Sequence, residues 1–152
     1  MEAAQSTFIS STFWTERIGP SAALKTLEIM EREKSWKTIT KIGNEIRERW
    51  QKLANFYNLK ISHMGLPALA GFTFDSKNAL EYKTLISQEM LSKGYLAGNL
   101  VYVCTEHSPE IIDNYFEILD EVFKLINDCE NGRDVKKLLK GEICHTGFKR
   151  LN

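Results

Sequence analysis

The feature that most constrains this chain is a long amphipathic pattern between residues 36 and 57. Apolar side chains recur there every three or four residues, which is the spacing of one face of an α-helix. They are Trp36, Ile39, Ile42, Ile46, Trp50, Leu53 and Tyr57. The opposite side carries Lys37, Lys41, Glu45, Glu48 and Lys52, which indicates a solvated face. The pattern predicts a helix of about six turns that packs against a domain core through one face.

Local residues refine this helix. We expect Ser35 to act as its N-cap, because a serine hydroxyl accepts hydrogen bonds from the first free amides. Gly43 costs a helix interior about 1 kcal/mol relative to alanine, so we predict close packing at that position. The aromatic residues Trp36, Trp50, Phe56 and Tyr57 follow helical spacing, which is typical of core side chains rather than of a base-stacking platform.

Three short segments have the composition of β-strands. Residues 59–63 and 69–74 flank a turn that contains Gly65 and Pro67, and residues 100–103 read Leu-Val-Tyr-Val. Helices are predicted over 20–33, after Asp75-Ser76 as far as Lys93-Gly94, after Ser108-Pro109-Glu110, and as a short polar element over 133–140. The order helix, helix, strand, strand, helix, strand, helix predicts an α+β fold, a three-stranded sheet backed by helices.

The charge balance disfavours several partners. Twenty Lys plus Arg equal twenty Asp plus Glu, so the formal net charge is zero and no global field attracts nucleic acid or an anionic membrane. Cys104, Cys129 and Cys144 are odd in number and form no CxxC pair, which argues against a disulfide framework or a zinc knuckle. With neither an 18-residue apolar run nor a secretion signal, we expect a soluble protein in the reducing cytoplasm.

Several motifs occur in an order typical of one enzyme family. They are STFWTERIGPSAALKTLE, then the long amphipathic helix, then GLPALAGFTFD, LSKGYLAGNLVYVCTEHSPEIIDNYFEILDEVF and the terminal HTGFKRL. Together they resemble the C-terminal portion of class III pyridoxal-phosphate-dependent aminotransferases, particularly the branch around glutamate-1-semialdehyde aminomutase. The resemblance covers essentially the whole chain and implies the small C-terminal domain of fold-type I enzymes, with a mainly antiparallel three-stranded sheet.

The resemblance also implies particular site residues. In that family a threonine in this loop binds the phosphate of the pyridoxal phosphate held by the neighbouring subunit of a homodimer, and the matching residue here is Thr12, with Ser11 able to assist. A hydroxyl and an amide near a helix start are suitable phosphate donors. Glu16 and Arg17 are candidates to face a small amine, keto acid or aldehyde substrate, or to form a surface pair.

The family's Schiff-base lysine belongs to a large domain upstream of the part matched here, and no lysine of this chain stands in the matching context. Covalent amine catalysis needs a desolvated lysine against the cofactor, so we expect the chain not to be catalytic alone. Residues 1–18 are then a connecting and interface segment from a missing large domain, and residues 19–152 are the small domain. Whether the parent enzyme transfers an amino group between molecules or moves it within one is left open.

Other functions remain as alternatives. The chain could be a stand-alone interaction or dimerisation module derived from such an enzyme, since Phe8, Ile9, Phe13, Trp14 and Ile18 suggest an apolar patch that needs a partner. A small enzyme with an unrelated site has no dyad or triad to support it. A metal site would require the scattered His63, His107 and His145 to converge, and a Cys144-His145 nucleophile pair is weak because adjacent residues of an extended tail point in opposite directions. We expect His107 to shape the loop before Ser108.

Overall fold

The computed structural model describes residues 16–145. The chain divides into two compact units, with the boundary between Ser35 and Trp36. Each unit is considered by itself. The boundary expected from the sequence lies after residue 18, between a connecting segment from a missing large domain and a small domain of residues 19–152, and it stays a prediction.

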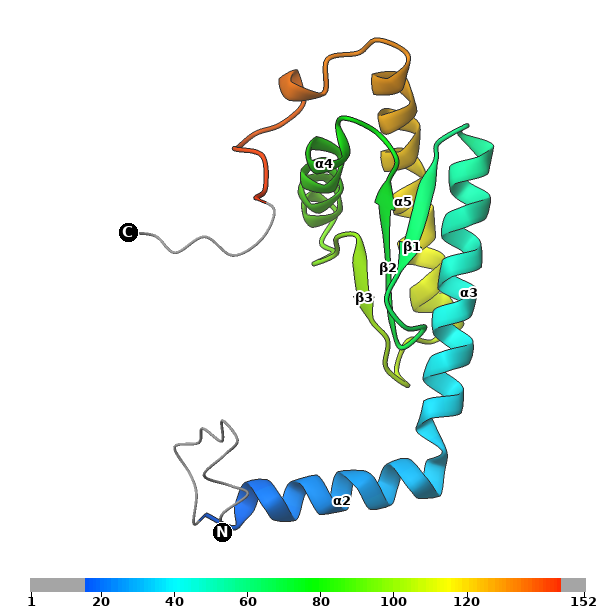
Figure 1. Cartoon of the computed structure of the whole chain (residues 1–152), viewed down its shortest axis with the longest axis vertical. Coiled ribbons are helices and arrows are strands. Elements are labelled where there is room, and N and C mark those ends of the chain that lie inside the picture. The colour runs from blue at the N-terminus through cyan, green and yellow to red at the C-terminus, as the bar shows by residue number, and fades with distance from the viewer. Residues whose placement is uncertain (1–15, 146–152) are drawn as a thin grey trace, which may run out of the picture. The chain divides into compact units, whose positions relative to one another are not determined.

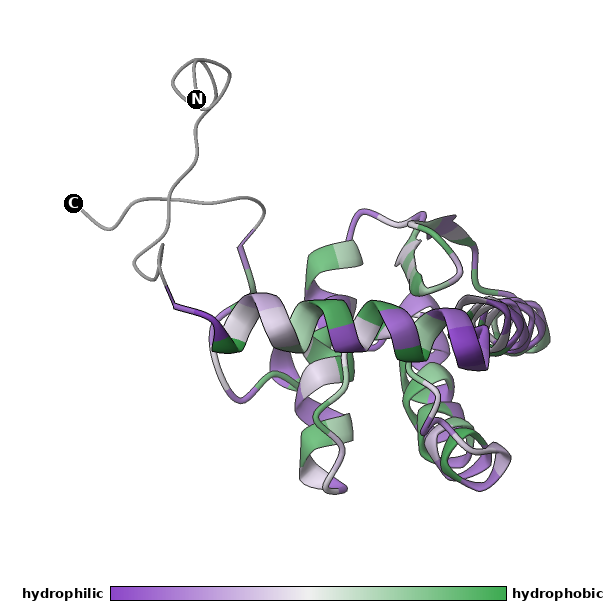
Figure 2. Cartoon of the chain, turned by 90° about the horizontal axis from the view of Figure 1, so that it is seen from below, coloured by the Kyte–Doolittle hydropathy of each residue, from purple (hydrophilic) through white to green (hydrophobic). Residues whose placement is uncertain are grey.

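The first unit contributes helix α2, Ile18–Glu33. None of its residues is buried, and apolar side chains such as Leu24 and Leu27 are exposed. Hydrophobic and hydrophilic residues are mixed along the helix (Figure 2). The helix ends where Lys34 takes a left-handed conformation with φ 50°, which is a common helix terminator. The predicted end of this helix at residue 33 is therefore confirmed.

The second unit is a three-stranded antiparallel sheet with helices on one face (Figure 1). The strands are β1 (Ile61–Met64), β2 (Leu69–Phe74) and β3 (Leu100–Tyr102), in the spatial order β1-β2-β3. The helices are α3 (Ser35–Phe56), α4 (Ala79–Ser92) and α5 (Pro109–Glu130). The predicted α+β fold with a three-stranded sheet backed by helices is confirmed.

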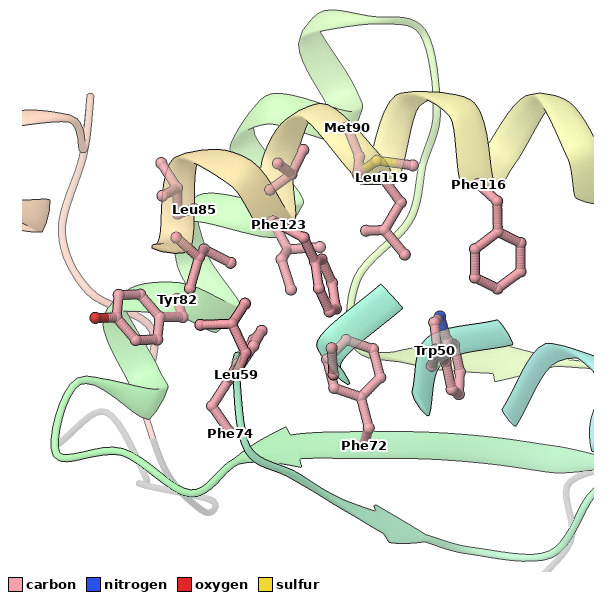
Figure 3. Close-up of a cluster of buried hydrophobic side chains, with 14 of the residues drawn as sticks. Trp50, Leu59, Phe72, Phe74, Tyr82, Leu85, Met90, Phe116, Leu119 and Phe123 are labelled. Carbon is pink, nitrogen blue, oxygen red and sulfur yellow. The ribbon is translucent and has the colours of Figure 1, made fainter. Parts of the chain in front are cut away.

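The core lies between the sheet and the helices. Phe72 of β2 has its ring centroid 4.8 Å from that of Trp50 in α3 and 5.9 Å from that of Phe123 in α5. Phe74 of β2 lies 5.4 Å from Tyr82 of α4. These rings point toward one another from the strand and the three helices (Figure 3). Burying an aromatic side chain stabilises a fold by roughly 1.5–3 kcal/mol, so this cluster joins all the layers.

Two sequence-based boundaries are confirmed in detail. Ser108 has an extended backbone and accepts a hydrogen bond from the Ile111 amide at 3.3 Å, with Pro109 opening α5. At the end of α4 the chain passes through Gly94 with φ 87°, a conformation that costs glycine little.

Other expectations were wrong. Ser35 is the first residue of α3 rather than a cap before it, and its buried hydroxyl has no hydrogen-bond partner in the described chain, because Lys34 already turns the chain directly into the helix. Phe56 is not a core residue, since it is 75% exposed at the last position of α3. The polar helix over 133–140 is a single 3-10 turn, Val135–Lys137, which is anchored by the buried Val135.

Candidate functional site

The expected phosphate site begins just outside the described residues. Thr12 and Ser11 lie there, so their role stays a prediction. Glu16 is described, and its carboxylate accepts hydrogen bonds from the amides of Ile18 and Gly19, both at 2.7 Å. These amides open α2, where a helix has unpaired donors and a partial positive charge. The first turn of α2 is therefore capped by the carboxylate of the residue that comes just before it in the described chain.

Arg17 lies beside this carboxylate at the start of α2. Its side chain is exposed, and its carbonyl accepts the Ser21 amide at 3.0 Å. Glu16 thus has a capping role, whereas contact of either residue with a substrate stays a prediction.

The lysines of the described chain do not resemble a Schiff-base residue. Every lysine in residues 16–145 is exposed except Lys83, which is half-buried on α4. A lysine that forms a Schiff base is desolvated in an apolar or cationic pocket. None of these positions provides that environment.

The histidines and cysteines serve local structure. The Nδ1 atom of His107 accepts a hydrogen bond from the Cys104 amide at 2.9 Å, which confirms that His107 shapes the loop before α5. Cys144 is held differently: its amide donates to the Thr84 hydroxyl at 3.0 Å and its thiol to the Leu80 carbonyl at 3.6 Å. Among residues 16–145, no three His, Cys, Asp or Glu side chains converge as metal ligands would.

Arg47 occupies a position that sequence patterns did not single out. Its guanidinium donates to the carbonyls of Met64 and Gly65, at 3.1 and 2.9 Å, and so fixes the turn between β1 and β2. Its buried Nε has no partner in the described chain. Partial burial, and then the nearby Arg47 charge, lower the pKa of His63 below its ordinary value, so His63 is neutral at pH 7.

A groove of about 320 Å³ runs beside β3, an edge strand of the sheet. Its lining is mainly apolar and includes Tyr95, Leu96, Leu100, Tyr102, His107 and Ile111. No acid, base and nucleophile are brought together there, so this groove suits binding rather than chemistry. Sequence patterns did not reveal it, because its walls come from three separate segments.

No helix in the described part of the chain is both long and apolar enough to span a bilayer.

Comparison with known proteins gives two related matches. The chain is 27% identical over 135 residues to the 3-aminobutyryl-CoA aminotransferase of Cloacimonas acidaminovorans (strain Evry), a match that covers 81% of this chain and 32% of that enzyme. A solved structure described as the PLP internal aldimine form of the Sphingopyxis sp. MTA144 FumI protein shares the fold, with a TM-score of 0.70 at 16% identity, over 90% of this chain and 34% of that one. No protein-family model matches the chain.

The chain therefore spans about a third of the length of these relatives. The resemblance to the C-terminal domain of a pyridoxal-phosphate-dependent aminotransferase, expected from the sequence motifs, is confirmed by these matches.

Proposed function

We propose that this chain is the C-terminal part of a cytoplasmic class III aminotransferase or aminomutase and closes one side of the substrate cleft of a homodimer. The observation that carries the proposal is the similarity to a curated aminotransferase over 81% of the chain. The exposed lysines of the described chain support a role that depends on a catalytic domain elsewhere. The substrate would be a small amine with a keto acid or aldehyde partner.

The sequence before α2 carries hydroxyl groups of the kind that donate to phosphate. Two hydroxyls, of Thr12 and Ser11, precede a helix whose first amides already hold the Glu16 carboxylate. Hydroxyl and amide donors at such a helix end favour anions. When bound, pyridoxal phosphate supplies the electron sink for amino transfer. The role of this chain is to donate hydrogen bonds to the phosphate and to position the neighbouring cleft wall.

The test is a chimera that joins the part of the Cloacimonas enzyme outside the match to this chain. We expect it to bind pyridoxal phosphate and to transfer amino groups. Thr12→Ala should raise the dissociation constant of the cofactor about tenfold, as expected for loss of one hydrogen bond to a charged group. Thr12→Ser should retain tight binding, and Ser11→Ala should have the smaller effect. A chimera in which Thr12→Ala leaves cofactor affinity unchanged would contradict the phosphate role.

The isolated chain provides a second test. Pyridoxal phosphate is added, its absorbance is followed, and any adduct is trapped with borohydride and located by mass spectrometry. We expect no site-selective adduct. A single stoichiometric lysine adduct that disappears on addition of an amine would show that this chain carries its own catalytic lysine.

A stand-alone interaction module is the second candidate. It is favoured by α2, which has no buried residue although Leu24 and Leu27 are apolar and exposed. Such a module should dimerise or aggregate through residues of its first unit, and a clean monomer in sedimentation would count against it.

A further inference from the structure

The outer side of β3 is an unpaired edge of the sheet (Figure 1). The amide of Val103, just after this strand, donates to the Ala68 carbonyl beside β2 at 3.0 Å. In an antiparallel ladder the backbone groups of successive residues point alternately toward the partner strand and away from it. Val101 therefore points toward β2, and the N–H and C=O groups of Leu100 and Tyr102 point outward. Among residues 16–145 these outward groups have no hydrogen-bond partner.

The space beyond this edge is open. The apolar groove of about 320 Å³ lies there, and its walls include Leu96 and Ile111, which are 96% and 47% exposed. None of the described residues that line it is Lys, Arg, Asp or Glu. Exposed edges normally carry a charge, a proline or a bulge that prevents pairing, whereas β3 reads Leu-Val-Tyr and keeps a regular register with β2. The edge is therefore free to accept another strand.

The outward groups of β3 are self-complementary. They belong to the residues on either side of Val101, so a twofold axis at Val101 would bring a second copy of β3 alongside in antiparallel orientation. Leu100 would then lie opposite Tyr102 of the second copy, and Tyr102 opposite Leu100 of the second copy. Residues opposed in this way exchange both of their N–H···O bonds. Every outward group of both strands would be satisfied.

The charge of the chain permits this self-pairing. Two identical surfaces can meet only where like charges do not face each other, and neither β3 nor the described lining of the groove contains a Lys, Arg, Asp or Glu. The formal net charge of the chain is zero, so two copies do not repel each other at longer range. A twofold interface uses the β3 edge of each copy once, which limits pairing through this strand to a dimer.

We propose that β3 pairs with β3 of a second copy of this chain, which joins the two sheets into one continuous sheet. This pairing goes beyond the proposed function, because it uses neither the Thr12 loop nor a cofactor. A three-residue strand beside a short groove forms a small interface, which is typical of weak association. We expect a dissociation constant of the dimer on the order of 10 µM.

Sedimentation velocity of the full chain tests the pairing, at concentrations above and below this value. We expect a reversible equilibrium between monomer and dimer. Tyr102→Pro removes an outward N–H, and proline is tolerated where the N–H of an edge strand points away from the sheet. Because the symmetric dimer loses this bond twice, its dissociation constant should rise at least about tenfold.

Two further substitutions at the same residue complete this series. Tyr102→Lys keeps the backbone donor and brings like charges to the junction, so it should also weaken the dimer, which keeps the test valid if proline disturbs β3. Tyr102→Phe is the matched control and should leave the dissociation constant unchanged. A chain that stays monomeric would overturn the proposal, and so would a dimer that neither Tyr102→Pro nor Tyr102→Lys weakens.

Cross-linking tests the position of the twofold axis. Val101 would face Val101 of the second copy as a non-hydrogen-bonded pair, with Cα atoms about 4.5 Å apart, which is within the range of about 4.4–6.8 Å for a disulfide. Val101→Cys is made together with Cys104→Ser, which removes the exposed native thiol. Mild oxidation should then give a disulfide between the two introduced thiols, located by mass spectrometry. Leu91→Cys in the same background, at an exposed leucine of α4, should give at least about tenfold less cross-linked dimer.

A variant of α2 separates this pairing from dimerisation through the first unit. Leu24→Lys combined with Leu27→Lys changes two exposed leucines of that helix and should leave the β3 dimer intact. A dimer that this double variant abolishes and Tyr102→Pro spares would overturn the pairing and support the first unit as the interface. The cofactor tests on the chimera do not depend on β3, so failure of the proposed function would leave this result standing.

Discussion

The indole Nε1 of Trp50 donates a hydrogen bond to the hydroxyl of Tyr115 at 3.0 Å in the interior of the second unit. Trp50 belongs to α3 and Tyr115 to α5, so the bond joins two helices that are distant in sequence. Burial raises the pKa of Tyr115 well above its ordinary range, which keeps the hydroxyl neutral. A polar pair inside an aromatic core specifies how the two helices meet, because each buried donor must find its acceptor.

Tyr115→Phe removes the acceptor and leaves the Trp50 N–H buried without a partner. We expect the free energy of unfolding, measured with urea, to fall by about 1–3 kcal/mol, the cost of an unsatisfied buried polar group. Tyr102→Phe is the matched control, since that ring is on the surface and its change should stay within about 0.5 kcal/mol. Equal effects of the two substitutions would show that the Trp50 bond contributes nothing specific.

Gly43→Ala is expected to destabilise the protein although alanine is the better helix former. An added Cβ would overlap the carbonyl of Pro67, a backbone group in the turn between β1 and β2 that cannot rotate away. The steric cost should exceed the gain of about 1 kcal/mol in helix propensity. Urea unfolding measures the net change, and Asn44→Ala at the neighbouring exposed position should be neutral or stabilising. A more stable Gly43→Ala protein would mean that the Pro67 turn moves freely.

The case of Gly43 shows what sequence could reveal. A glycine that interrupts a strong helical pattern implied close packing, and the Pro67 carbonyl is the group it approaches. The run at 69–74 predicted β2 at its observed bounds because composition and flanking turns agreed. Phe56 was misplaced because helical spacing does not tell where the partner layer stops. At the end of α3 its ring meets the edge of the neighbouring Tyr57 ring and stays largely exposed.

The candidate site was less predictable, because its contacts join residues that are far apart in the sequence. The hydrogen bonds of Arg47 depend on the β1–β2 turn lying beside α3, a long-range relation that one helix pattern does not contain. For Thr12 and Ser11, the family resemblance supplied the interpretation, and experiment must test it.

Arg47→Met tests the electrostatic link to His63. Partial burial of His63 disfavours the protonated imidazole, and the positive charge of Arg47 acts in the same direction, so both lower the pKa of His63. Removing the charge should therefore raise the pKa of His63 toward its ordinary value without fully restoring it. NMR titration of the imidazole measures the shift. Lys41→Met, on the exposed side of α3, removes an equal charge and should leave the His63 titration unchanged; a shift of similar size would indicate a general charge effect.

Alkaline pH should weaken the fold through the half-buried Tyr57 and the buried Tyr82. Burial, with hydrogen bonding to Asp120, raises the pKa of Tyr57 to about 12, and burial together with Glu130 raises that of Tyr82 to about 12. An unfolded tyrosine has a pKa of about 10, so between pH 10 and 12 the unfolded chain releases protons that the folded chain retains. Stability that is fully present below pH 10 is therefore lost as pH rises through this window.

The measurement is the free energy of unfolding between pH 8 and pH 12, in the native chain and in Tyr57→Phe. The variant should start less stable, because it lacks the hydrogen bond to Asp120 at 3.0 Å, and then lose less stability above pH 10. The difference in the free energy of unfolding between the two proteins should therefore shrink as the pH rises. Taking this difference cancels the contribution of the lysines, because they titrate in both proteins. A difference that stays constant to pH 12 would show that Tyr57 has the same pKa in the folded and unfolded states.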